Sequence, residues 1–274
     1  MFCLLILILI WGGCSFCYSL LSYNPWMWFL WIPLGLFTTI LLFVLWLYLV
    51  IIPIFKHVNP SSKFKANYAI HIMKMINIVC GVRLKVEGKE NLTPESKTLY
   101  VSNHKSLLDP VFMYIAVGRS LTAAGKAELF KIKPIMPFIR AFHVIKIDRS
   151  NDREAAKGIV EGIKYMKGGH GIIIYPEGGI KTREVEQMVA IKPGAYKLAT
   201  KSEAVIQPMA IIGSSKLSKR KFFSKRVTIT VRILPPITPE DYRDLNTHEI
   251  AYKVLEMVNS NFAHEGIYAI EEEN

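Results

Sequence analysis

The stretch that decides the fold of this chain is Thr98-Leu99-Tyr100-Val101-Ser102-Asn103-His104-Lys105-Ser106-Leu107-Leu108-Asp109-Pro110. Its first residues are β-branched, aromatic and apolar, which predicts a short buried strand. Asp109 is a favoured helix N-cap and Pro110 suits the first helical position, so a helix is expected to begin there. The pattern therefore predicts a strand, a loop and a helix in succession, with Asp109 capping the helix.

His104 and Asp109 are the two residues of this loop best suited to acid–base chemistry. Residues five apart on an α-helix point about 140° away from each other, so a regular helix would keep the two side chains apart. Across a loop, an oxygen of Asp109 can hold one ring nitrogen of His104 and leave the other free to take a proton. On these two residues alone, an ordinary loop histidine beside a helix cap is the simpler interpretation.

The N-terminal part of the chain is an uncharged block, because no Asp, Glu, Lys or Arg occurs before Lys56. Residues 2–22 and 26–54 are each long enough to cross a hydrocarbon core of about 30 Å, and the three residues between them are typical of a turn. We therefore predict an N-terminal transmembrane helical hairpin, with a tilt or a break near Pro33 in the second segment. A first segment that is re-entrant or lies in one leaflet is the alternative topology.

The whole net charge of +12 lies after this block. Lys56, His57, Lys63 and Lys65 follow it directly, and the positive-inside rule then places the rest of the chain on the cytoplasmic face of the cell membrane or of an endomembrane. The expected organisation is a membrane anchor over residues 1–55, an amphipathic connecting helix over 56–80 and an α/β domain over 81–274.

The remainder of the chain alternates between strand and helix patterns. Short runs rich in β-branched residues predict seven strands: Val82 to Val86, Thr98 to Val101, Leu121 to Ala124, Val144 to Ile147, Gly171 to Tyr175, Ala204 to Ile211 and Val227 to Leu234. Helical patterns lie at Pro110 to Val117, Asp152 to Met166, Pro193 to Lys201 and Thr247 to Phe262. Strands separated by helices predict an α/β fold with a mostly parallel mixed sheet flanked by helices.

The segment Tyr175-Pro176-Glu177-Gly178-Gly179 is a second candidate for a functional loop. It follows a predicted buried strand, as His104 does, and active residues of such sheets gather where strands end. Glu177 is suited to bind a polar group, and the glycines allow a ligand to approach the backbone. A plain surface turn is the alternative for this segment taken alone.

Metal and disulfide chemistry are not expected from the sequence. Cys3, Cys14 and Cys17 lie in the apolar block, Cys80 is isolated and the seven histidines are scattered. Reduced thiols fit a cytoplasmic domain, and we predict no metal site and no cofactor apart from the co-substrate named below.

Five motifs in order connect these observations. They are Asn103-His104 followed by Asp109, Lys126 in Gly-Lys-Ala-Glu-Leu-Phe, Ile147-Asp148-Arg149, Tyr175-Pro176-Glu177-Gly178, and Val205-Ile206-Gln207-Pro208-Met209. Their order and spacing resemble the glycerolipid acyltransferases typified by 1-acylglycerol-3-phosphate acyltransferases, over roughly residues 65 to 240. The resemblance implies transfer of a fatty acyl group from acyl-CoA or acyl carrier protein to the sn-2 hydroxyl of lysophosphatidic acid, giving phosphatidic acid in phospholipid synthesis.

The resemblance also implies roles for particular residues. His104 and Asp109 would be catalytic, as base and orienting acid, and Asn103, Lys126, Arg149, Glu177 and Gly178 would contribute to substrate binding. The family pattern continues after the Glu-Gly pair with Thr-Arg, whereas this chain has Gly179 and Ile180. Lys181 or Arg183 is the expected replacement for that arginine as a phosphate ligand.

Other functions compete with this interpretation. Glycerol-3-phosphate or another lysophospholipid is an alternative acceptor, because the phosphate site departs from the family pattern. Basic residues around Phe222-Phe223 are suited to rest on anionic membrane lipids. Attraction of acyl carrier protein or of the phosphates of coenzyme A, or an ordinary solvated loop, are the alternatives for this stretch. A nucleic-acid partner is not expected, since the chain carries no signature of a nucleic-acid-binding fold and its uncharged N-terminal block favours lipid. A non-catalytic lipid-binding protein is the remaining alternative.

Overall fold

The structure is a computed structural model, which describes residues 2–21, 24–60, 62–148, 151–220, 225–262 and 271–272. It divides into two compact units, Met1–Asn59 and Pro60–Asn274, and each is described by itself.

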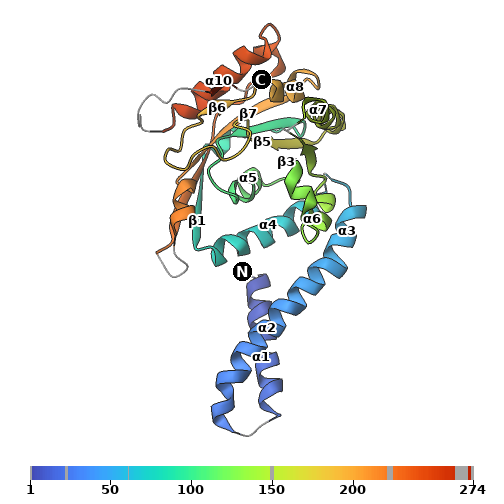
Figure 1. The fold of residues 1–274 in the computed structure, drawn as a ribbon, viewed down its shortest axis with the longest axis vertical. Coiled ribbons are helices and arrows are strands. Elements are labelled where there is room, and N and C mark those ends of the chain that lie inside the picture. Colours follow the sequence, from blue (N-terminus) through green and yellow to red (C-terminus); the bar gives the residue numbers. More distant parts are fainter. Residues whose placement is uncertain are drawn as a thin grey trace. The chain divides into compact units, whose positions relative to one another are not determined.

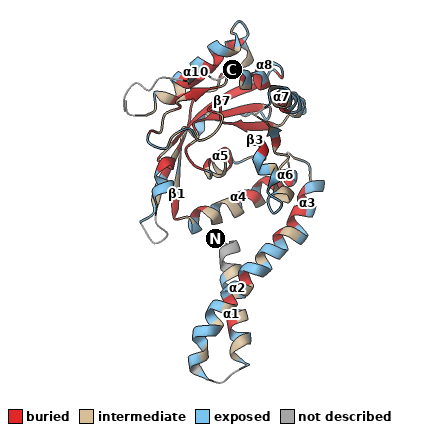
Figure 2. Ribbon diagram, in the orientation of Figure 1, coloured by how far each residue is buried: buried red, intermediate tan, exposed pale blue. Residues whose placement is uncertain are grey.

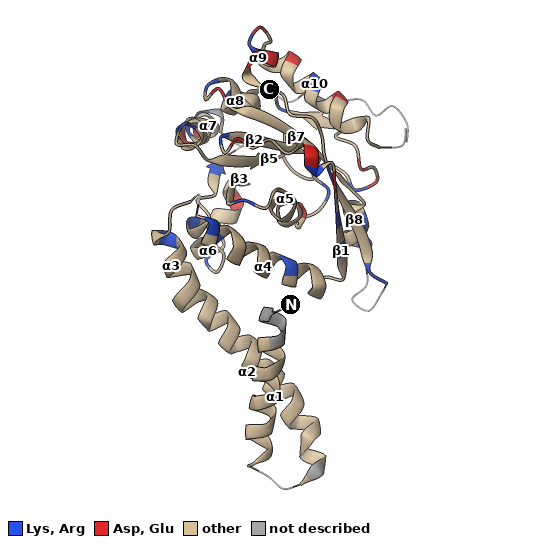
Figure 3. Cartoon of the chain, turned by 180° about the vertical axis from the view of Figure 1, so that it is seen from behind, with Lys and Arg blue, Asp and Glu red and all other residues tan. Residues whose placement is uncertain are grey.

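The N-terminal unit is a pair of apolar helices. Helix α1 (Phe2–Ser19) is followed by the 3₁₀ turn η1 (Pro25–Met27), and α2 (Trp28–Trp46) continues through the π-helical turn η2 (Leu47–Ile51) into α3 (Ile52–His57). The indole Nε1 of Trp11 donates a hydrogen bond to the Ile32 carbonyl at 2.9 Å, so the two helices pack as the predicted hairpin. The ribbons of α1 and α2 carry no charged residue, and the first basic positions appear in α3 (Figure 3).

One helix in the described part of the chain, Trp28–His57, is long and apolar enough to cross a membrane; the apolar helix Ile6–Ser19 is shorter. The expected break near Pro33 is not found, since α2 runs through this residue without interruption. Pro33 lies in the second turn, where its missing N–H removes a single hydrogen bond close to the helix start. The irregularity instead falls at η2. Part of the predicted turn, Tyr23, lies outside the described residues.

The second unit is built on a seven-stranded mixed sheet, and all seven predicted strands are confirmed. They are β1 (Val82–Glu87), β2 (Thr98–Ser102), β3 (Leu121–Lys126), β4 (Ile145–Ile147), β5 (Gly171–Ile174), β7 (Val205–Ile212) and β8 (Val227–Ile233). The order across the sheet is β1-β8-β7-β2-β5-β3-β4. Neighbours are parallel except β7 and β8, so the predicted mostly parallel sheet is also confirmed. Because β7, β2, β5, β3 and β4 share one direction, their carboxyl ends meet at the same edge.

Helices cover both faces of the sheet. Figure 1 shows α4 (Lys63–Val79) and α5 (Asp109–Val117) on one face, and α7 (Asp152–Lys167), α8 (Lys197–Thr200) and α10 (Thr247–Asn259) on the other. The sequence missed the short helix α6 (Met136–Ala141) and the two-residue pair of β6 (Ala190–Ile191) with β9 (Glu271–Glu272). The remaining short elements are η3 (Lys89–Asn91), η4 (Ala127–Lys131), η5 (Pro193–Tyr196), η6 (Ser214–Lys219) and α9 (Pro239–Tyr242).

The hydrophobic core is centred on the strands β2 and β5. All five residues of β2 are buried, as are the four of β5, which is why both read as continuous apolar runs (Figure 2). Leu99, Val101, Ile172 and Ile174 pack into one buried cluster with residues of α7, α8 and α10. The two loops that follow β2 and β5 therefore leave the most deeply buried part of the sheet.

Helix α7 lies close to the sheet because of a glycine. A Cβ added at Gly158 would come within 2.2 Å of the Lys146 carbonyl oxygen of β4, which is backbone and has little room to move. A glycine lowers the stability of a helix, so helix propensity does not explain the residue at this position. The close approach of α7 to β4 does, because a larger side chain at position 158 would not fit.

We expect Gly158→Ala to lower the free energy of unfolding by about 1 to 3 kcal/mol, because the added methyl group must push α7 away from β4. The thermal unfolding midpoint in detergent measures this. Gly194→Ala is the matched control, since its Cβ would meet nothing within 4 Å; equal midpoints for the two variants would contradict the packing argument.

Candidate active site

The loop between β2 and α5 brings His104 and Asp109 together. The Nδ1 atom of His104 lies 3.0 Å from Oδ2 of Asp109, so the predicted contact across the loop is confirmed. Asp109 is not the N-cap that the sequence predicted, because Leu108 holds that position and Asp109 is the first residue of α5. Its carboxylate turns back into the loop, where Oδ2 also accepts hydrogen bonds from the amides of Lys105 at 2.7 Å and Ser106 at 2.8 Å.

The imidazole of His104 contacts Asp109 through its edge and Tyr175 through its face. Its ring stacks on the ring of Tyr175, with centroids 4.1 Å apart and planes 18° from parallel. The His104 side chain is 15% exposed and that of Asp109 is fully buried. Burial raises the pKa of Tyr175 well above its usual value, and the negative charge of Asp109 raises it further, so the ring stays neutral. With Nδ1 turned to Asp109, Nε2 is the ring nitrogen directed away from it.

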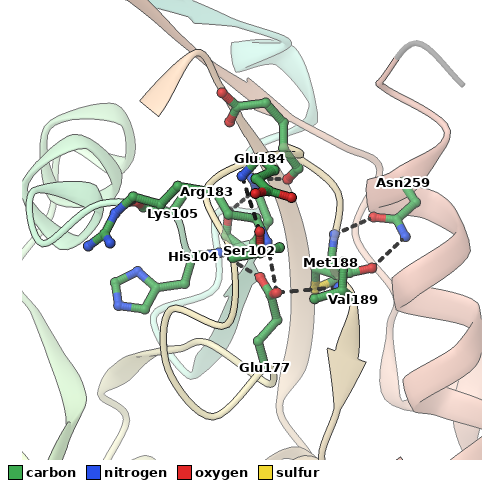
Figure 4. A network of polar contacts seen from close by, with 12 residues as sticks. Ser102, His104, Lys105, Glu177, Arg183, Glu184, Met188, Val189 and Asn259 are labelled. Carbon is green, nitrogen blue, oxygen red and sulfur yellow. Dashed lines mark hydrogen bonds and ion pairs between the residues drawn. The ribbon is translucent and has the colours of Figure 1, made fainter. Parts of the chain in front are cut away.

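Glu177 joins the two functional loops from below (Figure 4). Its Oε1 accepts a hydrogen bond from the His104 amide at 2.9 Å, and its Oε2 lies 2.9 Å from Nζ of Lys105. Both side chains of this ion pair are fully buried. Burial raises the pKa of the Glu177 carboxyl, while the charge and hydrogen bond of Lys105 and the backbone amides of His104 and Val189 lower it.

This arrangement gives Glu177 partners inside the protein. The sequence analysis assigned it a contact with substrate; we propose instead that it positions the His104 backbone. Asn103 is similar: it is fully buried, its Nδ2 donates to the carbonyls of Glu186 and Ile211 at 2.8 Å, and its Oδ1 accepts from the Ile211 amide. We therefore propose that Asn103 fastens the loop to β7.

The expected cationic residues lie at the same carboxyl edge of the sheet. Lys126 is the exposed last residue of β3. Arg183 is exposed, and its Nε donates a hydrogen bond to the Lys105 carbonyl at 3.1 Å, which ties it to the His104 loop. In Figure 4 the Arg183 and His104 side chains extend toward the same side. Lys181 is also exposed, in the same segment as Arg183, and Arg149 lies outside the described residues.

The glycine of the second loop has a conformational role. Gly178 has φ 78° and Gly179 φ 150°, which side-chain-bearing residues rarely adopt. These angles turn the chain directly after Glu177, so that the carboxylate points back beneath His104. Within the described residues, no group of three or more His, Cys, Asp and Glu side chains could hold a metal ion.

Sequence reasoning did not assign two important residues, Lys105 and Tyr175. Lys105 pairs with a residue 72 positions away, and no spacing rule connects them. Tyr175 was visible as the last residue of the predicted strand, but its stacking on His104 depends on the neighbouring positions of β2 and β5. For Lys105, the sequence offered one indication of a role in the site, which is its position directly after His104.

A half-buried histidine held by a buried carboxylate, with exposed cations at the same carboxyl edge of a mixed α/β sheet, is suited to remove a proton from an anionic substrate. The family model described as "Acyltransferase" matches residues 83–212. The chain therefore contains an acyltransferase domain and is an O-acyltransferase.

Several proteins named as 1-acyl-sn-glycerol-3-phosphate acyltransferases are similar to it. The probable enzyme of Mycoplasma pneumoniae is 27% identical, over 74% of this chain and 79% of that protein. The enzyme of Limnanthes douglasii is 29% identical over 60% of this chain and 58% of its own length, and that of Bacillus subtilis is 29% identical over 64% and 84%.

A solved structure shares the fold. The crystal structure of the 1-acyl-sn-glycerophosphate (LPA) acyltransferase PlsC from Thermotoga maritima has a TM-score of 0.62, with 23% identity, over 73% of this chain and 78% of that chain.

We expect Lys105→Met to lower the free energy of unfolding by about 3 to 5 kcal/mol, because it leaves the Glu177 carboxylate buried without its cation. The pKa of Glu177 should then rise further in the folded state. Stability should be greatest near or below the usual value of 4.5 and fall as pH increases through the raised pKa. Thermal unfolding between pH 4 and 8 measures both effects.

The double variant Lys105→Met, Glu177→Gln provides the control. It should lose less stability than the sum of the two single variants, since no uncompensated charge remains. Strictly additive losses would contradict the coupling of the two side chains.

Proposed function

We propose that this acyltransferase moves a fatty acyl group from a thioester to the sn-2 hydroxyl of 1-acylglycerol-3-phosphate, giving phosphatidic acid. The observation that carries the proposal is the 3.0 Å contact of His104 with the buried Asp109. Arg183 is bonded to the same loop, and the exposed Lys126 ends β3 at the same edge of the sheet. The names of the relatives agree with this acceptor.

The chemistry requires a base for a weak nucleophile. A glycerol hydroxyl is a poor nucleophile at neutral pH, and Nε2 of His104 is suited to take its proton as the oxygen attacks the thioester carbonyl. The new C–O ester bond forms and the C–S bond breaks. The proton then passes from the imidazolium to the leaving thiolate, which departs as the thiol, so the enzyme returns to its starting state.

Asp109 supports this cycle through its charge. Its Oδ2 holds Nδ1–H of His104 and so selects the tautomer with Nε2 available, and its negative charge stabilises the imidazolium. The two loop amides that also donate to Oδ2 keep the carboxylate in place. Because the substrate supplies the hydroxyl, an acyl-enzyme is not required.

The acceptor phosphate needs cations near the base. Arg183 is our first candidate, because its hydrogen bond to the Lys105 carbonyl places it next to His104 and its guanidinium can bind a phosphate through two nitrogens. Lys126 is the second, with Lys181 and Arg149 in the adjacent segments. This set replaces the arginine that the family pattern has at the position of Ile180.

The membrane is the expected location of the reaction. An apolar helix over Trp28–His57 suits a protein whose substrates are lipids. We propose that the catalytic unit faces the cytoplasm, since basic residues follow the apolar segments, and that anionic lipids and acyl-CoA or acyl carrier protein are its partners.

We expect His104→Ala to lower the rate of acyl transfer by at least about 10² to 10⁴, the usual contribution of a general base. The assay follows transfer from palmitoyl-CoA to lysophosphatidic acid by protein purified in detergent. His71→Ala, at an exposed site on α4, is the matched control. Full activity of a folded His104→Ala protein would rule out the mechanism.

We expect Arg183→Gln to raise the KM for lysophosphatidic acid by about ten- to a hundredfold, as loss of a charge-assisted bidentate contact would. Glycerol-3-phosphate and lysophosphatidylcholine, tested in parallel, identify the preferred acceptor. Lys253→Gln, at an exposed site on α10, controls for the loss of one positive charge. An unchanged KM in Arg183→Gln would remove this residue from the phosphate site.

A further inference from the structure

A cavity of about 430 Å³ lies in the second unit, between α7 and the segment η5–α8. Its floor includes Ala124 of β3 and Ile174 of β5, and its walls are formed by α7 and by residues 192–201. The volume falls in the range of small-molecule sites, which run from about 300 to 1,000 Å³. The reaction proposed above does not use this space for the acceptor phosphate.

One end of the cavity reaches the base. Tyr175, Pro176 and Gly178 line it, and the ring of Tyr175 stacks on the imidazole of His104 with centroids 4.1 Å apart. These residues follow β5 and therefore lie at the carboxyl edge of the sheet. Tyr175 thus belongs both to the cavity lining and to the contacts of His104.

The other end is cationic. Lys197 and Lys201 both line the cavity and are exposed, and Lys201 lies four residues before β7, at the amino edge of the sheet. Tyr175 directly follows β5 and so lies at the opposite, carboxyl edge of the sheet. Lys192 adds a third cation, and none of the described lining residues is acidic.

Between the two ends, the walls of the cavity are formed mainly by small, apolar residues. Ala155, Ala156 and Ile159 of α7 face Gly194 and Ala195 across the cavity. A Cβ at Gly194 would meet nothing within 4 Å, so there is open space in front of its backbone. A cavity lined by small side chains and accessible backbone groups is better suited to bind a thin, partly polar ligand chain than a bulky ring.

We infer that this cavity binds the phosphopantetheine arm of the acyl donor, with the thioester at the Tyr175 end and phosphate at Lys197 and Lys201. The inference rests on the proposed function, because it names the site of the second substrate of that reaction. Coenzyme A and acyl carrier protein share this arm. The cations assigned to the acceptor, Arg183 and Lys126, lie outside the cavity lining, so the two anionic substrates approach His104 by separate routes.

The test is the charge-reversed variant Lys197→Glu, Lys201→Glu, assayed with palmitoyl-CoA and with palmitoyl-acyl carrier protein. The KM for whichever donor the unaltered protein uses should rise at least about tenfold, equal to about 1.4 kcal/mol, and the KM for the acceptor should change less than about twofold. The matched control is Lys164→Glu, Lys167→Glu, which reverses two exposed charges of α7 that do not line the cavity.

A second variant tests the middle of the cavity. Ala156→Leu should raise the donor KM by the same factor for octanoyl and palmitoyl thioesters, since the arm is common to both. Glu161→Leu, exposed on α7 and outside the lining, is its control. An effect that grows with acyl-chain length would place the fatty tail in the cavity and overturn the inference.

A direct binding measurement separates the two proposals. Titration calorimetry of the unaltered full chain with 4′-phosphopantetheine should give heat that the Lys197→Glu, Lys201→Glu variant loses, whether or not acyl transfer to lysophosphatidic acid is observed. Binding without transfer would count against the proposed acceptor alone. An unchanged donor KM in the charge-reversed variant, or a raised acceptor KM, would overturn the inference and leave the proposed function standing.

Discussion

The candidate site depends on the interactions of the buried Glu177 carboxylate with Lys105 and with the His104 amide. The carboxylate accepts hydrogen bonds from the His104 amide and from Val189, and it pairs with Lys105 in a region without solvent access. The bonds to His104 and Lys105 join residues that are 73 and 72 positions apart in the sequence. A buried carboxylate is costly unless all its partners are present, so the loops after β2 and β5 must take up their positions together.

The network continues beyond Glu177. Val189 is held in place because its neighbour Met188 exchanges two hydrogen bonds with the Asn259 side chain, at 2.8 and 3.0 Å, at the end of α10. Asn103 fastens the other side of the loop to Ile211 of β7. His104 is thus fixed through its backbone by Glu177, through its ring edge by Asp109 and through its ring face by Tyr175. A base held in this way loses little entropy when the substrate arrives.

The topology is consistent with the separate approaches that we propose for the two substrates. Parallel strands place the loops after β2, β5 and β3 at one edge, where His104, Glu177 and Lys126 follow or end them. Helix α7 then returns across one face, and its small residues, including Gly158, let it lie close to β4. The cavity is bordered by α7, whereas Arg183 is bonded to the loop that carries His104.

The sequence by itself determined the seven strands, the apolar hairpin and the pairing of His104 with Asp109. Strand identity follows from local composition, and the short loop between β2 and α5 left the pair few other arrangements. Helix α6 was missed because its six residues are too few for a periodic pattern. Of the expected tilt or break near Pro33, the break is absent because a proline near a helix start costs little.

Only the tertiary structure decided what surrounds the base. The Asp109 side chain is turned into the loop and does not cap α5. There its Oδ2 has three partners, the amides of Lys105 and Ser106 and the ring of His104, which replace the hydrogen bonds of a helix cap. Glu177, expected at the substrate, is buried with Lys105, and Tyr175 reaches His104 only because β5 pairs with β2. Local patterns predict the strand ends that carry these residues; which side chains meet there depends on strand order, which is a long-range property of the folded chain.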